Sequence, residues 1–102
     1  MIPFSAVIIT FNEERNIERC LDSIKDIAAE IIVVDSGSTD QTRTICERYA
    51  VTFIVNPFEG HIQQKNFAVD QASNRWILSL DADEALSQEL KSSIKQIMSE
   101  KP

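Results

Sequence analysis

The chain has few of the residues on which several common classes of protein depend. It contains only two cysteines, Cys20 and Cys46, too few for a disulfide framework and without the spacing of a metal site. The N-terminus has no basic region and no long apolar segment, so we expect neither a signal peptide nor a membrane span. Lys and Arg number 10 against 16 acidic residues, and the net charge of -6 argues against a nucleic-acid partner. A reducing cytoplasm is therefore the expected compartment.

Glycine is also scarce, with two residues in 102, and neither lies near the apolar run of residues 5–10. A dinucleotide-binding Rossmann unit needs a glycine-rich turn after its first strand, so that a diphosphate can sit on the N-terminus of the following helix. Here the turn is Thr10-Phe11-Asn12-Glu13-Glu14, which is bulky and acidic and would repel an anionic diphosphate. A phosphorylated ligand would therefore need a cation held elsewhere.

The residues that are present indicate one α/β domain. Hydrophobic residues make up 43% of the chain, enough to form a core at this length. Four apolar runs, at residues 5–10, 31–34, 51–55 and 76–80, predict strands, and helical patterns separate them. This strict β-α-β-α-β-α-β-α alternation is typical of a parallel sheet with helices on both faces.

The helices are predicted from apolar spacing and from capping residues. The first follows an i, i+3, i+4, i+7 pattern through Ile17, Cys20, Leu21 and Ile24. The second has a capping box at residues 38–41, with Ile45 and Tyr49 on its inner face, and the third covers residues 62–72. The last begins after an N-cap at Ser87 and has one apolar side, formed by Leu90, Ile94 and Ile97.

Right-handed crossovers restrict the topology, and we predict a Rossmann-like sheet with strand order 3-2-1-4. This order places a topological switch point between the first and fourth strands, and ligands bind outside the carboxyl ends of strands at such points. Three polar clusters follow the strands, at residues 10–13, 35–37 and 81–83. We therefore expect these clusters to meet in one site.

The fourth apolar run ends in carboxylates, at Asp81-Ala82-Asp83-Glu84. Two aspartates separated by one residue project on the same side of a strand, because strand side chains alternate. Such a pair of hard oxygen ligands suits Mg²⁺ or Mn²⁺, which keep several waters and bind substrate phosphates. The alternative is an ordinary solvated junction between a strand and a turn, where acidic residues are common.

Single residues near these clusters carry weaker signals. Asp35 is suited to accept a hydrogen bond from a base N–H or a ribose hydroxyl, and equally to form a turn. Lys65 is suited to a phosphate or a base carbonyl, although a lone lysine is more often a solvated surface residue. His61 is assigned no role, and the single tyrosine and tryptophan are assigned to the core.

Four segments of the chain together resemble the N-terminal, nucleotide-binding half of a family-2 inverting glycosyltransferase with the GT-A fold. They occur in the family's order and at about its spacing, and they cover nearly the whole chain. The segments are IITFNEE at residues 8–14, IVVDSGSTDQT at residues 32–42, Lys65-Asn66, and LDADE at residues 80–84.

The resemblance implies a set of site residues and a divalent metal, Mn²⁺ or Mg²⁺. Asp83 would be the direct metal ligand, assisted by Asp81, and Asp81 would also lie near the ribose or the diphosphate. Lys65 stands where relatives carry Arg or Lys near the nucleotide. The nucleotide contacts implied are Thr10, Phe11, Asn12, Glu13, Asp35, Lys65, Asp81 and Ala82.

The resemblance also implies the activity. Family members transfer a sugar from a nucleotide donor, commonly a UDP-sugar, to an acceptor hydroxyl with inversion, and the acceptor expected here is a glycan or a lipid-linked molecule. The Asn-Glu-Glu and Asp-Ser-Gly-Ser-Thr-Asp pattern resembles relatives that build bacterial surface glycans such as lipopolysaccharide core. We expect membrane contact, at the inner face, only through parts of a longer protein.

Relatives are roughly twice this length or more, and their second half supplies the acceptor site and the general base. We therefore expect residues 1–102 to be the nucleotide-sugar-binding half of a transferase, inactive alone, with the catalytic base unassigned. A receiver-like signalling module is one alternative, although its phosphoacceptor should follow the third strand, where Asn56-Pro57 stands. A non-catalytic nucleotide-binding module is the other, and the sequence does not separate it from a truncated enzyme.

Overall fold

The computed structural model of the protein describes residues 2–100, so residues 1, 101 and 102 of the predicted domain lie outside the described part. Its elements alternate as predicted, and each strand is followed by a helix. The strands are β1 (Ile2–Thr10), β2 (Ala28–Asp35), β3 (Thr52–Val55) and β4 (Trp76–Asp81). The helices are α1 (Ile17–Ile24), α2 (Thr42–Cys46), α3 (His61–Asp70) and α4 (Gln88–Glu100).

The strands form one parallel sheet in the order β3-β2-β1-β4, which confirms the predicted topology. β1 lies between β2 and β4 and pairs with both. Its register places Thr10 beside Asp35 of β2 and Ile9 beside Asp81 of β4. The polar residues that follow β1, β2 and β4 therefore lie along the same edge of the sheet. This is the arrangement that the predicted site requires.

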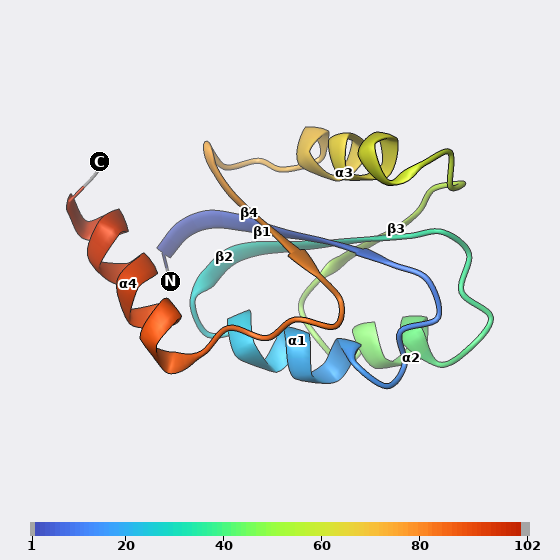
Figure 1. Cartoon of the computed structure of the whole chain (residues 1–102), viewed down its shortest axis with the longest axis horizontal. Helices are drawn as coiled ribbons and strands as arrows, with labels where there is room; N and C mark the ends of the chain where they lie inside the picture. The colour runs from blue at the N-terminus through green and yellow to red at the C-terminus, as the bar shows by residue number, and fades with distance from the viewer. Residues whose placement is uncertain (1, 101–102) are drawn as a thin grey trace.

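Helices cover both faces of the sheet, as expected, with α3 on one face and α1 and α2 on the other (Figure 1). The side chains of β1 alternate between the two faces, because strand residues alternate. Phe4, Ala6 and Ile8 belong to the larger core beneath α1 and α2, and Val7 belongs to the smaller core beneath α3. Burial on both faces explains why β1 is a continuous apolar run.

The predicted capping box at residues 38–41 is wrong. α2 begins at Thr42, and its N-cap residue, Gln41, makes no side-chain capping bond. The Ser38 hydroxyl instead donates a hydrogen bond to Asp35 Oδ1, and its oxygen accepts one from the backbone N–H of Asn12. Ser38, which the local pattern assigned to the cap of α2, therefore forms contacts with Asp35 and with the loop after β1 instead.

The predicted apolar side of the last helix is also partly wrong. Ile94 and Met98 pack against the larger core, but Leu90 is 47% and Ile97 is 52% exposed. The helix instead buries Lys91, whose Nζ lies 2.9 and 3.1 Å from the two carboxylate oxygens of Asp26. This pairing satisfies the lysine charge and sets the rotation of α4.

The start of α4 agrees with the prediction, because the Leu90 N–H donates to the Ser87 hydroxyl at 3.1 Å. Cys20 is fully buried, as predicted, while Tyr49 and Trp76 are only half-buried against the same core. Within residues 2–100, no helix combines the length and the apolar character that crossing a bilayer demands.

Candidate functional site: a cleft at the carboxyl edge of the sheet

A cavity of about 570 Å³ lies at the carboxyl ends of β1, β2 and β4 and beside the N-terminus of α3. Its volume falls within the range of small-molecule sites. Ile9, Thr10, Phe11 and Glu13 come from β1 and the loop after it, and Ser36 follows β2. The remaining wall is formed by Phe58, His61, Lys65, Asp81, Ala82 and Asp83.

Exposed charges gather at the β4 end of this cavity. Lys65 Nζ on α3 lies 3.8 Å from Asp81 Oδ1, and both side chains are about half exposed. Asp83 also lines the cavity, and its carboxylate has no hydrogen bond or ion pair with another described residue. Two carboxylates and one ammonium group are therefore available to a ligand here.

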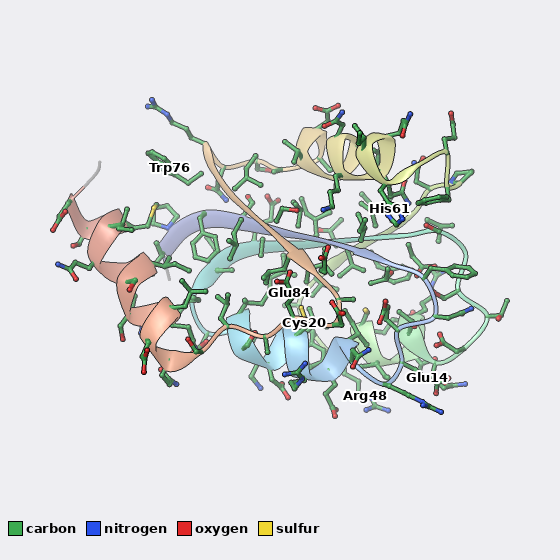
Figure 2. All side chains as sticks on the ribbon, viewed as in Figure 1. Glu14, Cys20, Arg48, His61, Trp76 and Glu84 are labelled. Atoms are coloured by element: carbon green, nitrogen blue, oxygen red, sulfur yellow. The ribbon has the colours of Figure 1, made fainter. Side chains whose placement is uncertain are left out.

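The backbone beneath these carboxylates is held in place by α1. The Arg19 guanidinium donates to the Asp83 carbonyl oxygen at 2.8 Å, and the Asp81 N–H donates to Glu84 Oε1 at 2.8 Å. Figure 2 shows Cys20 near Glu84, on the side of the sheet away from His61. Burial, with Glu84 nearby, raises the pKa of Cys20 to about 12, so this thiol remains protonated at neutral pH.

The opposite end of the cavity is organised around Asp35, which is only 2% exposed. Its Oδ1 accepts the hydroxyls of Thr10 and Ser38, both at 2.6 Å. Its Oδ2 accepts the N–H groups of Gly37 at 2.9 Å and Ser38 at 2.6 Å. Burial alone would raise the pKa of Asp35, but these hydrogen bonds, led by that of Ser38, outweigh burial and lower the pKa.

The loop after β1 and the loop after β2 are joined by a series of hydrogen bonds. Three successive backbone N–H groups of the first loop, those of residues 12, 13 and 14, donate to Ser38 Oγ, Thr42 Oγ1 and Asp40 Oδ2. In return, Asn12 Oδ1 accepts the N–H groups of Thr39 and Asp40. Side chains of residues 38–42 therefore accept the backbone N–H groups of the loop that leads into α1.

This joining explains how the site differs from a dinucleotide-binding turn. The backbone N–H groups just before α1, which would bind a diphosphate in such a turn, are already occupied by side chains of residues 38–42. Asn12 adopts a left-handed backbone with φ of 52°, a conformation that asparagine tolerates better than most residues. Of the charged groups that line the cavity, Lys65, Asp81 and Asp83 lie at the β4 end, and Glu13 lies on the loop after β1.

Most of the predicted site residues meet in the cavity. Its walls include seven of them, namely Thr10, Phe11, Glu13, Lys65, Asp81, Ala82 and Asp83. Asn12 and Asp35 do not line it: Asn12 joins the two loops, and Asp35 lies beneath Thr10. A direct contact between Asp35 and a nucleoside stays a prediction, and it would require one of four existing hydrogen bonds to break.

Sequence reasoning did not assign Ile9, Phe58 or His61 to the site, although all three line the cavity. Ser36, which belongs to the predicted cluster at residues 35–37 but was given no role of its own, also lines it. Figure 2 shows His61 at the start of α3. A signal for Phe58 and His61 was present, because the segment that follows a parallel strand begins at the carboxyl edge of the sheet. The cluster at residues 35–37 placed Ser36 at the end of β2, but no signal in the sequence indicated a role for its hydroxyl.

The acids of the cavity fit a metal that is shared with a ligand. Within residues 2–100, no group of three or more His, Cys, Asp and Glu side chains is arranged to hold a metal ion. The prediction that both aspartates project from the strand is wrong, because β4 ends at Asp81 and Asp83 lies in the turn after it. Both nevertheless line the cavity and supply two hard oxygen ligands. Mg²⁺ and Mn²⁺ can be held by one or two carboxylates together with substrate phosphates and water, so the donor set matches such an ion.

Comparison with known proteins identifies the family. The sequence profile described as Glycosyl transferase family 2 matches residues 5–102. The chain is 50% identical over 93 residues to an uncharacterized glycosyltransferase of Rickettsia bellii, covering 91% of this chain and 32% of the relative. It is 37% identical over 102 residues to the lipopolysaccharide core biosynthesis glycosyltransferase LpsC of Rhizobium meliloti, covering 95% and 37%.

Solved structures agree with this assignment. S. aureus TarS 1–349 in complex with UDP is 29% identical with a TM-score of 0.75, covering 97% of this chain and 32% of TarS. Glucosyl-3-phosphoglycerate synthase from Mycobacterium tuberculosis, in complex with Mn²⁺, UDP and phosphoglyceric acid, shares the fold at 23% identity and a TM-score of 0.77, covering 95% and 39%. The chain spans about a third of the length of the curated relatives. Because the profile covers nearly all of it, the chain belongs to glycosyltransferase family 2.

Proposed function

We propose that the cavity binds the nucleoside diphosphate part of a sugar donor, a UDP-sugar, with the diphosphate at the β4 end. The observation that carries this proposal is that a charged region and an aromatic, largely uncharged region line the same cavity. Asp81, Asp83 and Lys65 provide charge at one end, while Phe11 and Ser36 provide a flat apolar surface and a hydroxyl toward the other. A nucleotide has the same division between an anionic part and an aromatic base.

The charge at the β4 end requires a cation in addition to Lys65. The carboxylates of Asp81 and Asp83 would repel a diphosphate, and a bound Mn²⁺ or Mg²⁺ supplies the positive charge that stabilises diphosphate as a leaving group. Lys65 is paired with Asp81 at 3.8 Å, so a cation on Asp81 frees the ammonium group to bind a phosphate oxygen. A solved neighbour crystallised with both Mn²⁺ and UDP supports this arrangement.

The reaction proposed for the whole protein is transfer of the sugar to an acceptor hydroxyl with inversion. The proposed acceptor is a glycan or a lipid-linked molecule, and the likeness to LpsC, a lipopolysaccharide core biosynthesis glycosyltransferase, supports a role in bacterial surface glycan synthesis. A position at the cytoplasmic side of the membrane is part of the proposal. The carboxylates that line the cavity are placed on the donor side, so we infer that residues 1–102 bind the donor without transferring its sugar. The acceptor site and the general base belong to the other two thirds of such proteins.

Titration of the 102-residue chain with UDP, with and without Mn²⁺, tests the proposal. We expect binding with Mn²⁺ and little binding without it, because the carboxylates repel the diphosphate when no cation is present. Asp83→Ala should remove the Mn²⁺-dependent part of UDP binding. Glu89→Ala is the matched control, because it removes the same charge from an exposed position on α4 outside the cavity.

Two results would count against this function. Equal UDP binding with and without Mn²⁺ would show that Asp81 and Asp83 do not hold a cation for the diphosphate. An unchanged spectrum of the folded chain at millimolar UDP and Mn²⁺, recorded by two-dimensional NMR, would remove the nucleotide site itself.

A further inference from the structure

Three hydroxyl groups, those of Thr10, Ser36 and Ser38, lie at the β1 and β2 end of the site, and two of them have no proton to offer a ligand. Thr10 and Ser38 both donate to Asp35 Oδ1. A carboxylate only accepts hydrogen bonds, so the direction of these two bonds is fixed. Ser36 is the third hydroxyl, and it lines the cavity.

The proton of the Ser36 hydroxyl is left available by Gln64. Gln64 Nε2 donates to Ser36 Oγ at 3.2 Å, so Ser36 acts as the acceptor in that bond. Among residues 2–100, the structure contains no hydrogen bond in which this hydroxyl is the donor. Its own proton is therefore free for a group inside the cavity.

The orientation of the Gln64 amide is itself fixed. Gln64 is 1% exposed, and its Nε2 also donates to the backbone carbonyl of Asn56 at 3.1 Å. Gln64 Oε1 accepts the side-chain N–H of Asn56 at 2.9 Å. A backbone carbonyl cannot donate, so the reversed amide would place two oxygens together, and only the observed orientation satisfies every partner.

Ser36 also lies at the right distance from the charged end to meet the base of a nucleotide. It follows β2, whereas Asp81 ends β4, and β1 separates the two strands. Neighbouring strands are about 4.8 Å apart, so two spacings give roughly 10 Å. Phe11, which is 57% exposed, lines the interval between them. A diphosphate near Asp81 therefore leaves its base, and not its phosphates, within reach of Ser36.

We propose that Ser36 donates its hydroxyl proton to the 4-carbonyl oxygen of a uracil base, and that Gln64 is the positioning residue that keeps this proton directed at the ligand. The inference rests on the proposed function, and it adds a basis for base selection to it. Uracil presents a carbonyl oxygen at the position where cytosine presents an amino group. An amino group would leave the Ser36 proton without an acceptor, so the site favours a uracil nucleotide.

Binding of UDP and CDP with Mn²⁺ to the 102-residue chain and its Ser36→Ala variant tests this selection. The unaltered chain should bind UDP more tightly than CDP. Ser36→Ala should weaken UDP binding about tenfold and CDP binding less than about twofold, because only the carbonyl-bearing base loses a partner. Ser93→Ala, which removes an exposed hydroxyl from α4, should change neither affinity.

Gln64→Glu tests the positioning role. A carboxylate at residue 64 accepts the Ser36 proton and turns it away from the cavity, so UDP binding should fall as in Ser36→Ala while CDP binding is retained. The carboxylate also faces the Asn56 carbonyl, so we expect this variant to melt at a lower temperature and compare binding well below it. A melting curve for each variant confirms that the chain is folded. Retained CDP binding is a result that general loss of structure at Gln64 does not produce.

The outcomes separate this inference from the proposed function. If the unaltered chain binds neither nucleotide, the proposed function fails and the inference fails with it. If the chain binds UDP but Ser36→Ala leaves the ratio of UDP to CDP affinity unchanged, only the inference is overturned. An equal loss for UDP and CDP also overturns it, because the contact would then be made to a group that both nucleotides share, which is the 2-carbonyl oxygen of the base, the ribose or a phosphate.

Discussion

At one end of the cavity Asp35 is buried and accepts four hydrogen bonds. At the other end Asp81 and Asp83 are exposed, and only Asp81 makes an ion pair, at 3.8 Å from Lys65. The first carboxylate is part of the folded framework, because it holds two loops together. The second pair is held through its backbone and leaves its oxygens accessible. Acids at the ends of neighbouring strands can therefore have opposite roles, one in stability and the other in binding.

Of the substitutions that test this contrast, Asp35→Asn should cause the largest loss of stability. The new amide keeps the shape but removes the negative charge that four donors now face. Its N–H₂ group can be accommodated only opposite the hydroxyls of Thr10 and Ser38, which must then turn and accept, and Ser38 already accepts the Asn12 N–H. We expect the free energy of unfolding to fall by about 3 kcal/mol at pH 7, the range for disrupting a buried charge network. Urea denaturation followed by circular dichroism measures it, and a loss below about 1 kcal/mol would show that Asp35 is not structural.

The same pair of proteins gives a pH test. The hydrogen bonds hold the pKa of Asp35 below its ordinary value, so the ionised form stabilises the fold above about pH 4, and this contribution disappears as pH falls through the folded-state pKa. The stability difference between the unaltered chain and Asp35→Asn should therefore narrow below about pH 4. Other acids are common to both proteins and cancel in the difference. A difference that widens toward low pH would contradict this sign.

A smaller loss is expected at Asn12, where backbone conformation and loop contacts can be separated. Asn12→Ala removes the acceptor of two N–H groups and places alanine at φ of 52°, so we expect a loss of about 2 kcal/mol. Asn12→Gly loses the same bonds but tolerates the backbone, and it should be about 1 kcal/mol more stable than the alanine variant. Thermal unfolding of both variants, compared with the unaltered chain, measures the two parts. Equal losses would mean that the left-handed backbone carries no strain.

The smallest change in stability should follow Lys65→Ala. The Lys65–Asp81 pair is half exposed, and such pairs contribute little, so the free energy of unfolding should change by less than about 0.5 kcal/mol. UDP binding with Mn²⁺ should nevertheless weaken several-fold, because a cation near the diphosphate is lost. Lys95→Ala, on α4 outside the cavity, is the control of equal charge. A large loss of stability at Lys65 would contradict the contrast between the two ends.

The sheet could be predicted from sequence because few principles decide it. Strict alternation of apolar runs and helical patterns, with right-handed crossovers, left few strand orders, of which 3-2-1-4 was predicted and is observed. In a parallel sheet of this order the polar strand ends share an edge. The destinations of Ser38 and Lys91 could not be predicted in the same way. Ser38 bonds to a loop 26 residues away instead of capping its own helix, and Lys91 is buried by pairing with Asp26. Both outcomes depend on partners that local patterns do not include.

The same limit applies to the role of Asp35. Its residue type suits an accessible ligand contact and a buried loop anchor equally well, and only the positions of Thr10, Gly37 and Ser38 distinguish them. Ser36 is the reverse case, since its neighbours in sequence point into the loop network while its own hydroxyl lines the cavity. The direction of the Ser36 hydroxyl proton is set by a tertiary contact with Gln64, so the sequence alone does not predict it.

The hydrogen bonds between the loop after β1 and the loop after β2 have a consequence for engineering. Each loop supplies both donors and acceptors to the other, across a separation of 26 to 29 residues in the chain. Transplanting either loop from a relative by itself would leave several polar groups unmatched, and an insertion of one residue in either would shift the whole series. Chimaeras of this family should therefore exchange the two segments together, as a single cassette.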